Sequence, residues 1–340
     1  MTPTETIRVD CDASLESAVA RAITVLSRGG LVAVPTETVY GLAANARDPE
    51  AVAKIFAAKG RPATNPVIAH VPNVEAARAL VSEWPESASL LARAFWPGPL
   101  TIVLAKRIGA VAEDVTAGGP TVAIRVPSHP LLSRILNRID FPLAAPSANR
   151  SESISPTTAE HVLASLDGRV DLVLDAGPTA RGIESTVIDL AGPVRLLRPG
   201  PITRDQIEGL IGPLNRAAEE STGDGVARSP GMMKRHYAPK TSVEVSSDPA
   251  RAIHRHRSTG RRVAWIALVG DVVDPECPCR VMAADPIEYQ RDLYAALHWA
   301  DEQEAELIIV TAPPVGDAWE AIHDRLRRAS AFIGDLPQFP

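Results

Sequence analysis

Cysteine is scarce in this chain, with three residues in 340. Cys11, Cys277 and Cys279 are too few and too scattered for a disulfide framework. The pair Cys277 and Cys279, separated by one proline, lacks the two-residue gap and the second pair of a structural zinc site. Residues 1–14 are polar and acidic with no apolar core, so we expect no signal peptide. A reducing compartment suits this composition, and we predict a cytoplasmic protein.

Long apolar runs are missing too, because no stretch approaches the ~18 residues that a membrane helix needs. We therefore expect no membrane partner. Apolar residues make up 45% and charged residues 22% of the chain, which excludes a disordered polypeptide. The net charge of −6 argues against a protein that binds nucleic acid over its whole surface, while a local basic patch stays compatible with weak RNA contact.

The common nucleotide-binding and hydrolase motifs are also absent. The sequence has no G-x-x-x-x-G-K-S/T loop, no G-x-G-x-x-G turn, and no H-E-x-x-H, G-x-S-x-G or paired C-x-x-C pattern. These absences exclude classes of protein without identifying one.

Proline is abundant, with 30 residues beside 22 glycines, which is typical of a loop-rich α/β protein. A single core stops growing near ~250–300 residues, so the length indicates two domains. Short β-rich runs and helical patterns alternate up to residue 212, and the fold class they predict is a twisted mixed β-sheet with flanking helices. We expect a catalytic domain at 1–212, a linker or lid at 213–240 and a smaller Rossmann-like α/β domain at 241–340.

Individual elements follow from periodicity and caps. We expect strands near 31–34, 67–71, 100–105, 122–126, 142–145, 172–174, 186–190, 194–197, 263–269 and 307–310. Expected helices are 15–27, 48–60, 130–139, 157–166, 203–211, 287–300 and 318–331. The second helix has the clearest signals, because Asp48 can cap it, Pro49 suits its first turn and Gly60 can end it.

Polar, proline-punctuated segments follow several strands, where ligands bind in α/β sheets: PTETVYGL at 35–42, KGRPATNP at 59–66, PSAN at 146–149 and ESTV at 184–187. Lys59 and Arg61 flank a helix end, where cations stabilise the helix dipole. With Asn65 and His70 they also suit a phosphate-bearing ligand. His70 alone is as readily a hydrogen-bonded core histidine.

Arg125 follows an apolar run and shares a strand face with Thr121 and Ala123. It is either a surface-strand arginine or a bidentate ligand for a carboxylate. Ser155 precedes Pro156 and is expected to cap the helix that follows, a position that also favours an anion. Ser185 and Arg198 can each be plain strand residues.

The segment at 225–243 carries Arg228, Lys234, Arg235 and Lys240 and no acid. It is either a solvated basic linker or, because prolines stiffen the part with His236 and Tyr237, a docking segment.

Taken together, these segments resemble the YrdC-type threonylcarbamoyl-AMP synthases in their long two-domain form. PTETVYGL, K-x-R-P-x-x-N-P-x-x-x-H at 59–70, FWPGPLT at 95–101, VAIRVPSHP at 122–130, APSAN at 145–149, SPTT at 155–158 and ESTV occur in family order. SPGM-x-x-x-HYAP at 229–239 and DRLRRA at 324–329 mark the long form.

The resemblance implies that L-threonine, bicarbonate and ATP are condensed to threonylcarbamoyl-AMP, with release of pyrophosphate. The product would pass to the machinery that modifies tRNA beside the anticodon. Such chemistry needs positioning and charge neutralisation more than a nucleophile. Magnesium would accompany ATP, without a dedicated protein metal site.

The resemblance also assigns residues by motif position. Lys59 and Arg61 would be catalytic and Arg125 would clamp the threonine carboxylate. The threonine site would comprise Thr38, His70, Arg125, Ala145 and Ser185. The ATP site would comprise Lys59, Arg61, Asn65, Thr121, Ser147, Ser155, Arg198 and Tyr237, the last closing over the nucleotide as part of a lid.

Two alternative functions are a second enzyme activity and, from a different class of protein, RNA binding without turnover. A carbamoyl-transfer enzyme of the hydrogenase-maturation type would need cysteine-rich zinc modules, which three cysteines cannot supply. An RNA-binding module would bind tRNA in a strongly salt-dependent way without ATP turnover.

Overall fold

The computed structural model describes residues 3–215, 237–330 and 332–333, so most of the linker expected at 213–240 lies outside the described residues. The described chain forms two compact units. The first contains residues 3–151, 156–180 and 184–215, and the second contains 152–155, 181–183 and the residues from 237 onward. Two short pieces of the N-terminal part therefore belong to the second unit.

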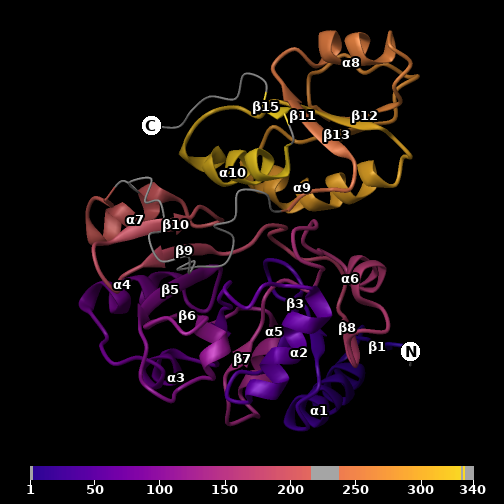
Figure 1. The fold of residues 1–340 in the computed structure, drawn as a ribbon. Coiled ribbons are helices and arrows are strands. Elements are labelled where there is room, and N and C mark those ends of the chain that lie inside the picture. The colour runs from indigo at the N-terminus through magenta and orange to yellow at the C-terminus, as the bar shows by residue number, and fades with distance from the viewer. Residues whose placement is uncertain (1–2, 216–236, 331, 334–340) are drawn as a thin grey trace. The chain divides into compact units, whose positions relative to one another are not determined.

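The first unit is built on a mixed ten-stranded sheet in the order β1-β8-β2-β3-β7-β4-β6-β5-β9-β10 (Figure 1). Its strands are β1 (Glu5–Arg8), β2 (Val32–Val34), β3 (Gly41–Asn45), β4 (Ala69–His70), β5 (Leu100–Ala105), β6 (Thr121–Arg125), β7 (Leu143–Ala144), β8 (Leu172–Asp175), β9 (Thr186–Asp189) and β10 (Arg195–Arg198). Both parallel pairs, such as β4 with β6, and antiparallel pairs, such as β5 with β6, occur. The predicted strands are present, whereas β1 and β3 had not been predicted.

Helices cover both faces of this sheet because its inner strands are apolar on both sides. Val32 and Val34 pack in one cluster with apolar residues of α1 and α5, while Ala33 belongs to a second cluster with residues of α2 and α4. The helices are α1 (Asp12–Ser27), α2 (Pro49–Lys59), α3 (Val74–Ala79), α4 (Glu86–Phe95), α5 (Pro130–Leu136), α6 (Ala159–Leu166) and α7 (Arg204–Ile211), with a 3-10 turn η1 (Glu113–Thr116). No helix among the described residues is long and apolar enough to cross a bilayer.

Helix α2 forms as its sequence predicts. Asp48 Oδ1 accepts hydrogen bonds from the N–H groups of Glu50 (3.0 Å) and Ala51 (3.3 Å), and Pro49 occupies the first turn. Gly60 ends the helix at φ 61°, a left-handed conformation that glycine adopts without strain. This cap places Lys59 in the last turn of the helix.

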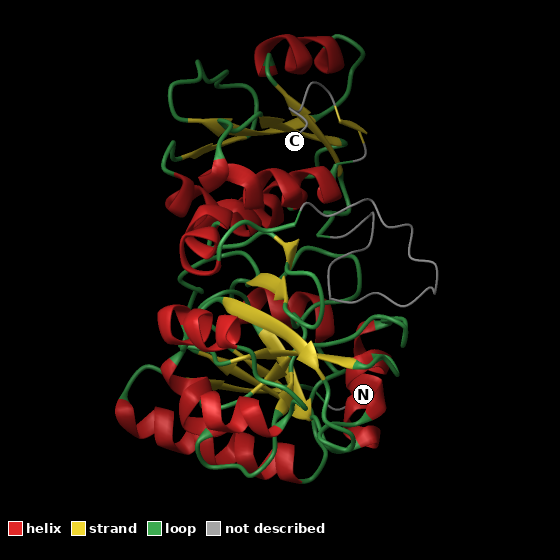
Figure 2. Cartoon of the chain, turned by 90° about the vertical axis from the view of Figure 1, so that its left-hand side faces the viewer, coloured by secondary structure: helices red, strands yellow, loops and turns green. Residues whose placement is uncertain are grey.

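The second unit has a parallel five-stranded sheet in the order β13-β12-β14-β11-β15. Its elements are β11 (Ser242–Ser246), α8 (Pro249–Arg257), β12 (Val263–Leu268), β13 (Cys279–Met282), α9 (Pro286–Asp301), β14 (Leu307–Thr311), η2 (Asp317–Trp319), α10 (Glu320–Ala329) and β15 (Phe332–Ile333). The chain crosses from β11 to β12 in one direction and from β13 to β14 in the other. Right-handed crossovers then place α8 on one face and α9 on the opposite face, as Figure 2 shows. The predicted fold class is confirmed.

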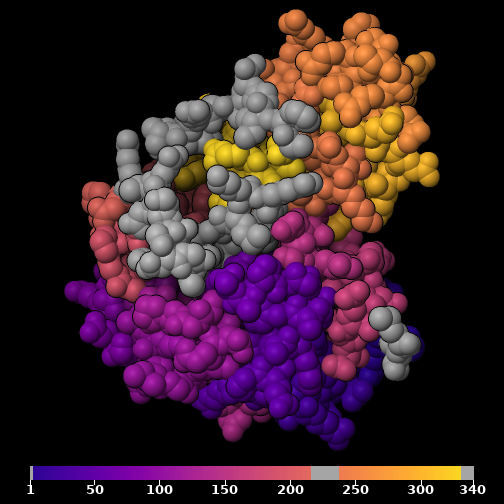
Figure 3. All heavy atoms as spheres, in the orientation of Figure 1, coloured from indigo at the N-terminus to yellow at the C-terminus, as the bar shows by residue number. Residues whose placement is uncertain are grey.

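The space-filling view shows mainly the N-terminal elements of the first unit, in indigo to magenta (Figure 3). In the second unit it shows the outer surface of α8 and its neighbours in orange.

Candidate active site

One face of strands β4, β6, β5 and β9 gathers the polar residues of four separate sequence segments. Side chains alternate along a strand, so Arg125 and Ala123 lie on the same face of β6. The register pairs Arg125 with His70 of β4 and Ala123 with Val103 of β5. Buried Ile68, Val103, Ala123 and Val187 form a small apolar cluster on this face. The predicted grouping of Arg125 with Thr121 and Ala123 on one strand face is confirmed.

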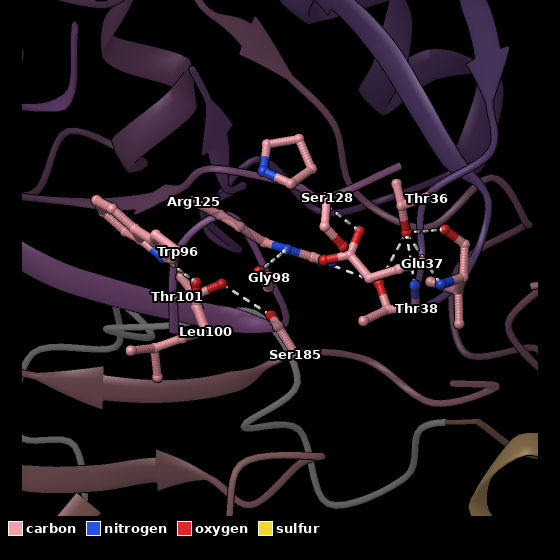
Figure 4. Close-up of polar contacts among 12 residues, drawn as sticks. Thr36, Glu37, Thr38, Trp96, Gly98, Leu100, Thr101, Arg125, Ser128 and Ser185 are labelled. Carbon is pink, nitrogen blue, oxygen red and sulfur yellow. Dashed lines mark hydrogen bonds and ion pairs between the residues drawn. The ribbon is translucent and has the colours of Figure 1, made fainter. Parts of the chain in front are cut away.

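The loop after β2 brings two further polar groups to Arg125. Thr36 Oγ1 accepts hydrogen bonds from the N–H groups of Thr38 (3.0 Å) and Val39 (3.2 Å), which is a turn that threonine commonly stabilises. The turn presents Glu37 and Thr38 to the guanidinium, as Figure 4 shows. All three side chains of the turn, Thr36, Glu37 and Thr38, are buried.

Arg125 is held on three sides (Figure 4). Its Nε–H donates to the carbonyl of Gly98 (3.2 Å), Nη1 donates to Thr38 Oγ1 (3.0 Å), and Nη2 forms an ion pair with Glu37 Oε1 (2.6 Å). Only 3% of the residue is exposed, so the interpretation as a surface-strand arginine is wrong. At least one N–H on each terminal nitrogen has no partner among the described residues, because the ion pair at Nη2 lacks the alignment of a hydrogen bond. This arrangement suits a bidentate carboxylate.

Glu37 is a buried charged residue of this face that the sequence did not single out. Its second carboxylate oxygen accepts from the N–H of Ser128 (3.2 Å). Burial raises the pKa of this carboxyl, but the charge and hydrogen bond of Arg125, with two backbone hydrogen bonds, outweigh burial and leave the pKa below its usual value of 4.5. A lone acid inside a motif otherwise made of apolar and hydroxyl residues was the signal available in the sequence.

His70 lies beside Arg125 and is neutral. Burial and the nearby Arg125 lower the pKa of His70 to about 3, and Glu37 opposes this shift. Its Nδ1 atom is buried and makes no hydrogen bond to any described residue. The core-histidine alternative accounts for its burial but not for this free nitrogen, which is able to accept a hydrogen bond from a ligand.

Ser185 connects Arg198 to this face. Its hydroxyl is 2.8 Å from Thr101 Oγ1, and Arg198 donates to its carbonyl (3.0 Å) and its hydroxyl (3.2 Å). Both residues are buried, and Arg198 is the last residue of β10. We call Glu37, Thr38, His70, Arg125 and Ser185 the Arg125 cluster.

A second buried cation lies at the end of α2. Lys59 Nζ donates to the carbonyls of Ser147 (2.6 Å) and Asn149 (2.5 Å) and approaches Asn149 Oδ1 (3.5 Å). Burial and the neighbouring Arg61 lower the pKa of Lys59 well below its usual value, while Glu184 opposes the shift. All three ammonium N–H groups thus face oxygens of the PSAN segment.

Arg61 stabilises the following loop. It donates from Nε to the carbonyl of Asn65 (3.1 Å) and from Nη2 to that of Pro66 (2.9 Å). The structure therefore brings the KGRPATNP and PSAN segments together. We call Lys59, Arg61, Asn65, Ser147 and Asn149 the Lys59 cluster.

Two further predicted site residues, Thr121 and Ala145, form no hydrogen bond with Arg125 in the described part of the chain. Thr121 is four residues from Arg125 at the other end of β6, about 13 Å along a strand. Ala145 donates its N–H to the carbonyl of Ile68 (3.1 Å), beside the apolar cluster.

Ser155 and Tyr237 belong to the second unit. The prediction that Ser155 caps a helix beginning at Pro156 is wrong, because α6 begins at Ala159 and Thr158 caps it. Tyr237 stacks on Tyr294 with 5.8 Å between ring centroids, and the Arg325 guanidinium lies 5.1 Å from its ring.

The two clusters give this α/β protein two arrangements that suit small anions. One is an arginine with N–H groups left for a carboxylate, and the other is a lysine–arginine pair beside the carbonyl oxygens of the PSAN segment. No group of three His, Cys, Asp or Glu side chains able to hold a metal occurs among the described residues.

Comparison with known proteins gives the class and then the family. Residues 24–200 match the family described as "Telomere recombination", the Sua5/YciO/YrdC group, and residues 202–331 match "Threonylcarbamoyl-AMP synthase, C-terminal domain". The chain therefore belongs to the two-domain Sua5/YrdC family, and the resemblance found in the sequence is confirmed.

Individual relatives of known function match nearly the whole chain. The threonylcarbamoyl-AMP synthase of Bacillus subtilis is 40% identical over 92% of both chains, and that of Pyrococcus abyssi is 38% identical over 90% of this chain and 92% of its own. The crystal structure of P. abyssi Sua5 complexed with L-threonine matches with a TM-score of 0.88 and 38% identity, covering 98% of this chain and 99% of the other.

Proposed function

We propose that this protein is an L-threonylcarbamoyladenylate synthase, a nucleotidyltransferase that condenses L-threonine, bicarbonate and ATP. The observation that carries the proposal is Arg125, a buried arginine with an unengaged N–H group on each terminal nitrogen, in a chain 38% identical to a protein solved with L-threonine. The predicted family function and enzyme class agree with the synthases that cover most of this chain.

The Arg125 cluster would bind threonine. The carboxylate would accept a remaining N–H group from each terminal nitrogen of Arg125, and Thr38, His70, Ser185 and the backbone at Ala145 would surround the hydroxyl and the amine. Because His70 is neutral and its Nδ1 is free, it is able to accept a hydrogen bond from the substrate. The amine must lose a proton before it can attack carbon dioxide or bicarbonate to form a carbamate.

The Lys59 cluster would bind the triphosphate. A carbamate oxygen attacks the α-phosphorus and pyrophosphate leaves, so negative charge must be neutralised throughout the step. Lys59 and Arg61 supply that charge, and a phosphate oxygen that contacts Lys59 directly would replace one of its carbonyl partners. Asn65, Thr121, Ser147, Ser155, Arg198 and Tyr237 are the further proposed ATP contacts.

Magnesium would enter with ATP. The cations, amides and hydroxyls of the Lys59 cluster suit phosphate oxygens rather than a metal ion, so the triphosphate and water would be its ligands. When bound, magnesium neutralises part of the phosphate charge. We further propose that the adenylate passes to the tRNA-modifying transferase machinery.

Pyrophosphate release from the full-length protein tests the function. Release should require L-threonine, bicarbonate and ATP together, and chelation of magnesium should abolish it. Release that is unaffected by omission of threonine would overturn the proposal. An RNA-binding module would instead show salt-dependent tRNA affinity with no turnover.

A further inference from the structure

Glu37 belongs to the Arg125 cluster but is not among the residues proposed to contact threonine. It is 8% exposed, and its carboxylate contacts Arg125 at 2.6 Å and the N–H of Ser128 at 3.2 Å. Burial of a carboxylate is costly unless it is paired, and removal of one partner of a buried pair leaves the other charge uncompensated. Its place beside the guanidinium is therefore a constraint on Arg125.

The acceptors around Arg125 fix the orientation of its guanidinium. Gly98 and Thr38 each take one N–H, and Glu37 occupies one side of Nη2. Each terminal nitrogen therefore keeps at least one N–H for a ligand. A planar guanidinium fixed on three sides offers this edge in one orientation, so a carboxylate meets a preorganised clamp.

Glu37 also sets the net charge around Arg125. Glu37 and Arg125 sum to zero, and His70 is neutral. His129 is likewise less readily protonated than usual, because burial lowers its pKa and the charge of Glu37 opposes this shift only in part. Arg198 donates to Ser185 and is assigned above to the nucleotide. A carboxylate bound by Arg125 thus adds an uncompensated negative charge unless the substrate brings its own cation.

We propose that Glu37 is a positioning and specificity residue, which orients Arg125 for the substrate carboxylate and balances its charge so that the site selects a zwitterionic α-amino acid over a simple hydroxy-acid anion. This inference rests on the proposed function of the Arg125 cluster. It adds a residue and a selection rule to that function.

Two substitutions separate the two roles. Glu37→Gln keeps the length and an acceptor oxygen but removes the charge, whereas Glu37→Asp keeps the charge but withdraws it by one methylene group. The ligands are L-threonine and (R)-3-hydroxybutyrate, which is threonine without its amino group. Isothermal titration of the full-length protein gives the ratio of their dissociation constants.

We expect the wild type to prefer threonine strongly and Glu37→Gln to reduce this ratio by about tenfold or more, since a bare arginine accepts the anion. Glu37→Asp should keep the ratio but weaken threonine binding. The matched control is Glu244→Gln in the second unit, where the carboxylate also meets an arginine at 2.6 Å, and its ratio should equal that of the wild type.

An unchanged ratio in Glu37→Gln would overturn the charge-balancing role. Unchanged threonine affinity in Glu37→Asp would overturn the positioning role, and this arm remains decisive if Glu37→Gln does not fold. Absence of threonine binding by the wild type would instead refute the proposed function itself, so the two failures are distinguishable.

Discussion

Two of the buried cations of the first unit, Arg125 and Lys59, are compensated by different partners. Arg125 faces the carboxylate of Glu37 at 2.6 Å, whereas Lys59 faces the carbonyls of Ser147 and Asn149 at 2.6 and 2.5 Å. A carboxylate cancels the charge of its partner, while carbonyl dipoles solvate a cation and leave its charge in place. The two clusters therefore differ in net charge although both are buried and hydrogen-bonded.

This difference matches two kinds of ligand. A neutral pair with an N–H group left on each terminal nitrogen suits the carboxylate of a zwitterion, for which geometry matters more than charge. Lys59 and Arg61 place two positive charges near the single negative charge of Glu184. Burial and then Arg61 lower the pKa of Lys59, and Glu184 opposes this shift. A polyphosphate relieves the repulsion between the two cations. We therefore propose that the residues around Arg125 bind the amino acid and those around Lys59 bind the phosphates.

The largest expected effect comes from Arg125→Gln. This change removes the clamp and leaves Glu37 buried without its partner, a situation that costs ~3–5 kcal/mol when a buried pair is broken. The value of kcat/KM for threonine should fall by about 10³-fold at saturating ATP. Pyrophosphate release measures the loss and thermal melting monitors the fold.

Arg134→Gln is the matched control, because Arg134 forms an exposed ion pair with Glu16. Exposed pairs contribute little, so its kinetics should stay near those of the wild type. A normal threonine KM in Arg125→Gln would show that the neutral cluster does not bind the amino acid.

A smaller but still large loss is expected for Lys59→Ala. If its charge acts on phosphate, the ATP KM should rise and turnover should fall, together by about 10²-fold in kcat/KM. Lys54→Ala is a close control, because Lys54 lies on the same helix and also donates to a backbone carbonyl, that of Gly29 at 2.7 Å. It should retain activity. A Lys59→Ala protein with a lower melting temperature but an unchanged ATP KM would show that Lys59 only stabilises the PSAN loop.

Local signals in the sequence predicted much of this arrangement. Asp48, Pro49 and Gly60 fixed both ends of α2 and hence the place of Lys59. Alternation along β6 correctly grouped Arg125 with Ala123 and Thr121. These features depend on neighbours within a few residues, which is the range over which caps and strand alternation act.

Features that depend on distant segments were not predictable in the same way. The partner of Arg125 lies 88 positions earlier in the chain, and nothing in periodicity links Glu37 to it. Ser155 was expected to start a helix because Ser-Pro resembles a cap, yet Thr158 caps α6 instead. Strand β1 pairs with β8 across more than 160 residues, and its short alternating sequence was too weak to predict a strand.

The smallest expected effect is on the pH dependence of stability when His70 is replaced. It tests whether the Arg125 cluster is neutral, in contrast to the Lys59 cluster. The pKa of His70 is about 3 in the folded protein against an ordinary value of 6.5, because of burial and then Arg125. Between these values the unfolded chain binds a proton that the folded chain does not, so the free energy of unfolding must fall as the pH falls below 6.5. A His70→Gln protein lacks this contribution.

Urea unfolding at pH 7 and pH 5 should therefore show a smaller loss of stability for His70→Gln than for the wild type, by ~1–2 kcal/mol. His254→Gln, at an exposed position on α8, should lose as much as the wild type. In Arg125→Gln the repulsion on His70 disappears and unpaired Glu37 attracts its proton, so the loss should again be smaller. An equal loss in the wild type and His70→Gln would mean that His70 is protonated in the folded protein, and that the Arg125 cluster carries a positive charge rather than none.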